Sequence, residues 1–202
     1  IDLEMNARAH VYCRSDYFIG QKPNDTAFIL GQNATLNLTP YLPFQGCEFN
    51  CVPVNDDYAA FSIISSGTVM TPSDFDGGII RRAFSGDETA WFKKVFDIAA
   101  RRRPFYMGDF YPLTDETGAG NDVWCAWQCD RPDLKAGFAI FFRRGAATEA
   151  SRTFRLGGIA PDAEYELDVY GGSQKTVKSS ELEMWSARLE QRSFQLLFYK
   201  KR

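Results

Sequence analysis

Large apolar residues recur at every second position in three short segments that follow Pro132. The segments cover residues 138–142, 164–169 and 194–198. A period of two residues is typical of a β-strand with one buried face and one exposed face. Turn residues separate the segments, as Gly157 and Gly158, Pro161 and Asp162, and Gly171 and Gly172. Short strands joined by frequent turns predict an antiparallel β-sandwich over residues 104–202.

The first half of the chain shows a different pattern, in which short β-prone runs precede helical segments. The predicted strands are residues 10–14 and 58–64, and the predicted helices are residues 25–39 and 85–103. The second helix has the clearer signature, because Ser85 and Glu88 form a capping-box motif and Pro104 follows its end. Strand-then-helix units predict an α/β arrangement of βα repeats for residues 1–103. Two units cannot close a (β/α)8 barrel, which takes about 250 residues. They therefore form something smaller, or the polypeptide is the end of a longer enzyme.

Between the two halves lies an aromatic-rich stretch, residues 103–132, in which Gly, Pro, Asp and Asn force the backbone to turn. Its large rings are Phe105, Tyr106, Phe110, Tyr111, Trp124 and Trp127. We expect these rings to pack one domain on the other. The alternative is an aromatic platform that stacks on a sugar or a base.

Composition excludes several classes of partner. A net charge of -3 and a sequence pI near 5.3 argue against nucleic-acid binding, which needs a concentrated basic face. No run approaches the roughly 18 apolar residues of a membrane span, so we expect no membrane partner. The sequence shows no signal peptide and does not begin with Met, so we expect the natural N-terminus to lie upstream. The compartment therefore stays open.

Five cysteines raise the question of a metal site. Four of them form two pairs at the same spacing, Cys47 with Cys51 and Cys125 with Cys129. Zinc sites usually use Cys-x2-Cys knuckles in small domains that lack a core, and this chain is rich in core residues. An odd count favours reduced, buried thiols. We therefore predict no metal and no cofactor.

Several segments, in the same order along the chain, resemble a known family. They are IDLEM at residues 1–5, RSDY at 14–17, YLPFQG at 41–46, GDFYPLT at 108–114, AWQ at 126–128 and DRPD at 130–133. They are similar to the C-terminal portion of melibiase-type α-galactosidases of glycoside hydrolase family 36. That family has a (β/α)8 catalytic barrel followed by an antiparallel β-sandwich. The resemblance implies that residues 1–103 are the end of the barrel and residues 104–202 the sandwich.

The resemblance also implies a division of catalytic roles. Retaining glycosidases need a carboxylate nucleophile and a carboxylic acid roughly 5 Å apart. The family's acid/base aligns with Asp2, whereas its nucleophile lies on an earlier strand that has no match here. Asp16 follows the first predicted strand, where barrels place groups that face the ligand, so it is a candidate for the sugar subsite. The alternative role for Asp16 is a helix N-cap, and we expect His10, the only histidine, to be structural.

Two hypotheses follow for the function. In the first, the parent protein is a retaining hydrolase of α-galactosides, and this chain is inactive alone because it lacks the nucleophile. In the second, the chain is a noncatalytic carbohydrate-binding or structural module. Unfinished barrel strands would expose edges and apolar faces, which favours a homo-oligomer.

Overall fold

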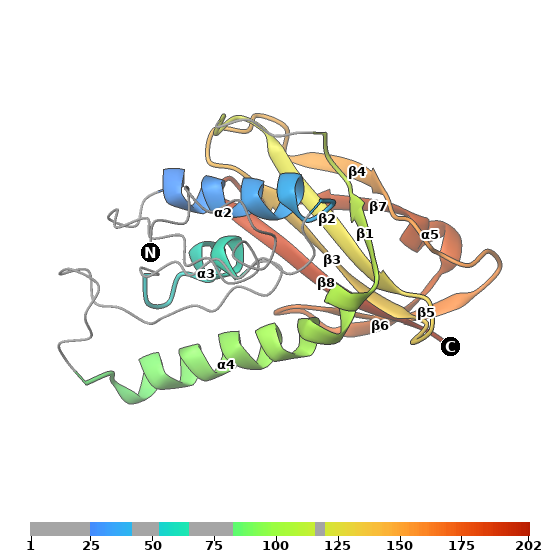
Figure 1. Ribbon diagram of the computed structural model, residues 1–202, viewed down its shortest axis with the longest axis horizontal. Helices are drawn as coiled ribbons and strands as arrows, with labels where there is room; N and C mark the ends of the chain where they lie inside the picture. Colours follow the sequence, from blue (N-terminus) through green and yellow to red (C-terminus); the bar gives the residue numbers. More distant parts are fainter. Residues whose placement is uncertain (1–24, 42–52, 65–82, 116–119) are drawn as a thin grey trace. The chain divides into compact units, whose positions relative to one another are not determined.

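The computed structural model describes residues 25–41, 53–64, 83–115 and 120–202 (Figure 1). The chain divides into two compact units, Ile1–Arg103 and Pro104–Arg202. Each unit is described by itself below.

The described part of the first unit is helical. It contains α2 (Asp25–Leu38), α3 (Asp57–Ile63) and α4 (Gly86–Arg102). The two helices predicted from the sequence are confirmed as α2 and α4, and the capping box of Ser85 and Glu88 is formed at the start of α4. The predicted strand at residues 58–64 is wrong, because most of this run is α3.

Local capping and packing explain why that run is a helix. Asp56 is its N-cap, and a side-chain oxygen of Asp56 accepts a hydrogen bond of 2.9 Å from the backbone N–H of Ala59. On the side of α3 that meets α2, the amide of Gln32 donates to the hydroxyl of Tyr58 at 3.0 Å and to that of Ser62 at 2.8 Å. Because one side chain contacts both residues 58 and 62, these two must lie on the same face, as residues four apart do in a helix.

Gly31 lets α2 and α3 approach closely. A Cβ atom at this position would lie 2.6 Å from the carbonyl oxygen of Ser62. Only a residue without a side chain fits there, so Gly31 belongs to the contact between the two helices.

The second unit consists of two antiparallel sheets. Its short elements are η2 (Arg103–Met107), which begins at the boundary between the units, and α5 (Ser179–Glu183). Its strands are β1 (Asp109–Pro112), β2 (Trp124–Arg131), β3 (Ala136–Arg143), β4 (Ser151–Arg155), β5 (Glu164–Val169), β6 (Gln174–Lys178), β7 (Met184–Arg188) and β8 (Ser193–Lys201). Six strands form one sheet in the order β1-β2-β3-β8-β5-β6, and β4 pairs with β7 (Figure 1).

One face of the six-stranded sheet packs against β4 and β7. The core between them takes alternate residues from the sheet, among them Phe141, Leu167 and Leu197, and adds Phe154 of β4 and Trp185 of β7. On β5 this alternation is the period of two seen in the sequence, with Tyr165 and Leu167 in the core. On β3 and β8 the residues predicted from that period, among them Ile140 and Leu196, lie on the opposite face, and the core takes the residues between them. The coarse form of the predicted fold, an antiparallel β-sheet unit consistent with a sandwich, is therefore confirmed.

The opposite face of this sheet is apolar as well. Trp127, Ile140 and Leu196 lie side by side on β2, β3 and β8, and all three are buried. Phe105 of η2 contacts the ring of Phe138 at a centroid distance of 6.0 Å. A sheet with two buried faces explains why β3 has no polar stripe.

The barrel part of the predicted fold stays a prediction. Its first strand, expected at residues 10–14, lies outside the described residues, and so do Cys13, Cys47 and Cys51.

Candidate functional site

Both site residues predicted from the sequence, Asp2 and Asp16, lie outside the described residues, as does His10. Their roles therefore stay predictions. The described residues contain a different site, a surface pocket in the second unit.

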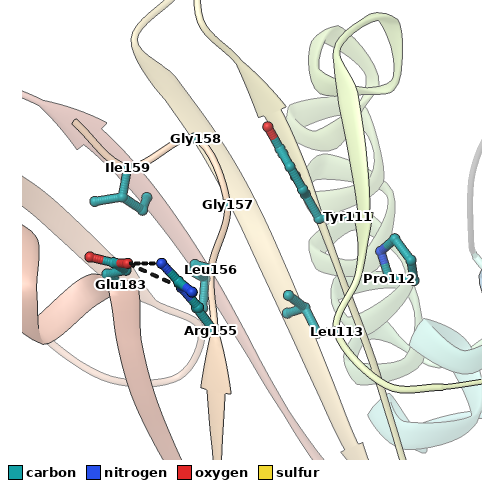
Figure 2. Close-up of a pocket in the computed structure, with 9 residues that line it drawn as sticks. All are labelled: Tyr111, Pro112, Leu113, Arg155, Leu156, Gly157, Gly158, Ile159 and Glu183. Atoms are coloured by element: carbon teal, nitrogen blue, oxygen red, sulfur yellow. Dashed lines mark hydrogen bonds and ion pairs between the residues drawn. The ribbon is translucent and has the colours of Figure 1, made fainter.

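The pocket has a volume of about 420 Å³ and lies where β1, β4, the β4–β5 loop and α5 meet (Figure 2). It is lined by Tyr111, Pro112, Leu113, Arg155, Leu156, Gly157, Gly158, Ile159 and Glu183. Figure 2 shows Tyr111 on one side of the pocket and the Arg155–Glu183 pair on the other. The pocket therefore combines an aromatic ring, aliphatic side chains and one pair of opposite charges.

The side formed by Tyr111 depends on two adjacent glycines. A Cβ on Gly157 would lie 2.3 Å from Cε1 of Tyr111, so the ring packs directly on the backbone of the β4–β5 loop. Gly158 has a φ of +69°, and a Cβ there would lie 2.8 Å from Oδ2 of Asp130. Both the close approach and the left-handed conformation require glycine.

The opposite side is an ion pair. Nη2 of Arg155 lies 3.1 Å from Oε1 of Glu183, and Nε of Arg155 donates to the same oxygen at 3.2 Å. The backbone N–H of Leu156 also donates to the carbonyl of Glu183 at 2.8 Å, which joins the end of β4 to the end of α5. The ion pair is exposed, so its contribution to stability is small.

A buried polar network lies behind the glycine loop. The amide of Gln128 donates to the carbonyl of Gly157 at 2.8 Å and accepts from its N–H at 2.8 Å. The same amide donates to the hydroxyl of Tyr199 at 2.6 Å, and that hydroxyl donates to Oδ1 of Asp130 at 2.7 Å. Gln128 therefore connects the sheet to the loop, and every polar group of its side chain has a partner.

Gly137 makes room for this network. It faces Tyr199 on β8 and Asp130 on β2 in the strand register. A Cβ on Gly137 would lie 2.2 Å from the hydroxyl oxygen of Tyr199. The tyrosine therefore crosses β3 above a glycine to reach the carboxylate.

The acidic groups in and beside the network have raised pKa values. Burial raises the pKa of Asp130, the hydrogen bond from Tyr199 partly opposes this, and the carboxylate of Asp109 raises the pKa further. Burial also raises the pKa of Tyr111, and the charges of Asp109 and Asp130 add to this rise. The pKa of Tyr199 is raised mainly by burial, so its hydroxyl stays a hydrogen-bond donor.

Sequence reasoning found only part of this site. It included Tyr111 in the aromatic stretch, but it interpreted Gly157 and Gly158 as an ordinary turn and did not single out Arg155 or Glu183. The adjacent glycines were the available signal, since a glycine that must accommodate a close contact often marks a site.

The cysteines and helices add two findings. Cys125 and Cys129 are buried on β2, and within the described ranges no group of three or more His, Cys, Asp or Glu residues could hold a metal ion. No helix of the described residues is long and apolar enough to cross a membrane.

The fold of this chain is similar to part of several solved structures. No protein-family model matches this sequence, and no curated protein sequence does. Among solved structures, GH36 α-galactosidase AgaB from Geobacillus stearothermophilus matches 90% of this chain with a TM-score of 0.65 and 16% identity. GH36 α-galactosidase AgaA from the same organism matches 78% of this chain with a TM-score of 0.58 and 18% identity. A variant of AgaA in complex with stachyose matches 78% with a TM-score of 0.56 and 19% identity.

The chain therefore has the fold of one portion of these α-galactosidases. The resemblance seen in the sequence motifs is confirmed at this level. The chain spans 25% of the length of AgaB and 22% of AgaA. Activity, substrate and partners of such a whole enzyme belong to the proposal below.

Proposed function

We propose that this chain is the C-terminal part of a retaining glycoside hydrolase that acts on α-galactosides. The observation that carries the proposal is the fold likeness to AgaB over 90% of the chain, together with the order of the motifs in the sequence. Residues 1–103 contribute the last βα units of a (β/α)8 barrel, and residues 104–202 contribute the β-sandwich. The family 36 nucleophile lies outside this sequence.

In this proposal Asp2 is the general acid and then the general base. It protonates the leaving oxygen while the nucleophile forms the glycosyl-enzyme, and it then activates the water that releases the sugar. An exposed aspartate with a pKa near 4 is a poor acid at neutral pH, so Asp2 needs the rest of the barrel around it. Asp16 borders the sugar subsite and accepts hydrogen bonds from hydroxyl groups.

The ligands of two similar solved structures support the proposed substrate class. Structures of AgaA variants have been solved in complex with raffinose and with stachyose, both of which are α-galactosides. Raffinose is therefore the first substrate to test.

The test compares two proteins with an aryl α-galactoside and with raffinose as substrates. One is the 202-residue chain, and the other is a longer form that includes any upstream coding sequence of the same reading frame. We expect no saturable turnover by the short chain and measurable kcat by the long form. Asp2→Asn in the long form should lower kcat for raffinose by several orders of magnitude, because this substrate needs protonation of its leaving group.

Three results would contradict the proposal. These are saturable hydrolysis by the short chain, no hydrolysis by a folded long form, and an Asp2→Asn variant with normal kcat. Absence of hydrolysis with retained sugar binding would favour the alternative, a noncatalytic carbohydrate-binding module.

A further inference from the structure

We propose that the pocket of the second unit is a binding site for one neutral saccharide unit. This site lies entirely within residues 104–202 and uses no catalytic carboxylate. It is therefore separate from the proposed hydrolysis, and either proposal can fail without the other.

The walls of the pocket match the two kinds of surface that a sugar ring presents. The C–H face of a sugar is apolar, and Tyr111, Leu113 and Ile159 offer it an aromatic ring and aliphatic groups (Figure 2). The hydroxyl groups at the rim need donors and acceptors, which the opposite side supplies. A volume of about 420 Å³ is within the usual range of ligand pockets.

The ion pair has unused hydrogen-bonding capacity. Both of its contacts use Oε1 of Glu183, which leaves Oε2 as an acceptor. Nη1 of Arg155 has no hydrogen-bond partner among the residues that the structure describes. A donor and an acceptor held side by side suit two adjacent hydroxyl groups, since each hydroxyl can both donate and accept.

Charge balance in the pocket favours a neutral ligand. The guanidinium of Arg155 is the basic group of the lining, and the carboxylate of Glu183 neutralises it at 3.1 Å. The raised pKa of Tyr111 keeps its hydroxyl uncharged. A phosphate or carboxylate ligand would have to break the ion pair, whereas a polyol can bind to it as it stands.

The glycine side of the pocket is held in place before a ligand arrives. The two hydrogen bonds between Gln128 and Gly157 fix this glycine, and the ring of Tyr111 lies directly on it. A site that is already ordered loses less conformational entropy on binding.

The experiment follows amide chemical shifts of the 202-residue chain during titration with raffinose, maltotriose and inorganic phosphate. We expect a saccharide to shift the amides of Leu113, Gly157 and Ile159, with a Kd on the order of millimolar. Arg155→Ala and Glu183→Gln should each weaken binding at least tenfold, or about 1.4 kcal/mol. Both side chains are substantially exposed, so neither variant should unfold the unit.

Two controls make the result specific. Glu166→Gln disrupts another exposed ion pair of the same unit, in which Nε of Arg202 lies 3.3 Å from Oε1 of Glu166, and it should leave the affinity unchanged. Asp2→Asn should also leave these shifts unchanged, although it stops the proposed hydrolysis in the long form. This second control separates the pocket from the catalytic part.

The proposal is overturned if neither saccharide shifts the pocket amides, or if Arg155→Ala and Glu183→Gln bind like the parent chain. It is also overturned if phosphate alone shifts these amides, since the pocket would then be an anion site.

Discussion

The side-chain amide of Gln128 forms two hydrogen bonds of 2.8 Å with the backbone of Gly157, although the two residues lie 29 positions apart. One residue of β2 thereby fixes the loop between β4 and β5. This contact joins the six-stranded sheet to the pocket.

Replacing Gln128 with Leu should lower the free energy of unfolding by roughly 3 kcal/mol, because polar groups shielded from water lose hydrogen bonds. The groups affected are the N–H and C=O of Gly157 and the hydroxyl of Tyr199. Urea unfolding followed by tryptophan fluorescence measures the change. The matched control is Gln191→Leu, since Gln191 is exposed and makes one long hydrogen bond of 3.4 Å. Equal losses in both variants would show that the Gln128 contacts do not hold the loop.

Gly157→Ala should destabilise the unit by about 2 kcal/mol, because the new methyl group would overlap the ring of Tyr111. Gly171→Ala is the control. Gly171 also lies in a turn, with a φ of +73°, but nothing lies within 4 Å of its missing Cβ. Its substitution therefore costs only backbone strain, about 1 kcal/mol.

The double variant Gly157→Ala with Tyr111→Ala tests the cause of this loss. Removing the ring should relieve the overlap, so the double variant should be more stable than the sum of the two single changes predicts. If the two single losses of unfolding free energy simply add, the cost of Gly157→Ala does not come from overlap with the ring of Tyr111.

Asp130→Asn should change how stability depends on pH. The pKa of Asp130 is raised in the folded state, so its neutral form is favoured there, and the stabilisation is complete below the unfolded pKa near 4. It is lost as the pH rises through the folded pKa. The parent chain should therefore lose unfolding free energy relative to Asp130→Asn above about pH 4. Urea unfolding at a series of pH values measures this difference, and parallel profiles would show that Asp130 does not contribute.

Ser85→Ala should destabilise the start of α4 by about 1 kcal/mol, because the capping box loses its side-chain acceptor. The hydroxyl of Ser85 accepts from the N–H of Glu88 at 3.2 Å, and the carboxylate of Glu88 accepts from the N–H of Ser85 at 2.8 Å. Hydrogen exchange of the Glu88 amide measures the loss locally. Ser173→Ala, at an exposed turn of the second unit, should leave this exchange rate unchanged.

The aromatic stretch was predicted to be a joint, and within the second unit its residues have several roles. Phe105 packs on Phe138, Trp124 lies in the sandwich core, and Trp127 lies on the opposite face of the sheet. Tyr111 lines the pocket. Composition predicted that these rings add large apolar surface to the core. The face of the sheet to which each ring points depends on strand register, which the sequence of one strand does not determine.

The predicted strand at residues 58–64 shows a second limit. A short apolar run fits a buried strand and a buried helix equally well by periodicity. Two contacts favour the helix over the strand. Asp56 caps its N-terminus, and Gln32 of α2 contacts both Tyr58 and Ser62.

The sequence by itself determined several local elements of this protein. Large apolar residues at every second position predicted strands β3, β5 and β8, and the motif of Ser85 and Glu88 predicted the start of α4, because each signal acts between near neighbours. Only the tertiary structure decided that Gln128, Gly157 and Tyr199 meet, and that Arg155 and Glu183 face Tyr111 across a pocket. The physical reason is that these contacts join strands and loops far apart in the chain, and their positions are set by sheet order and register.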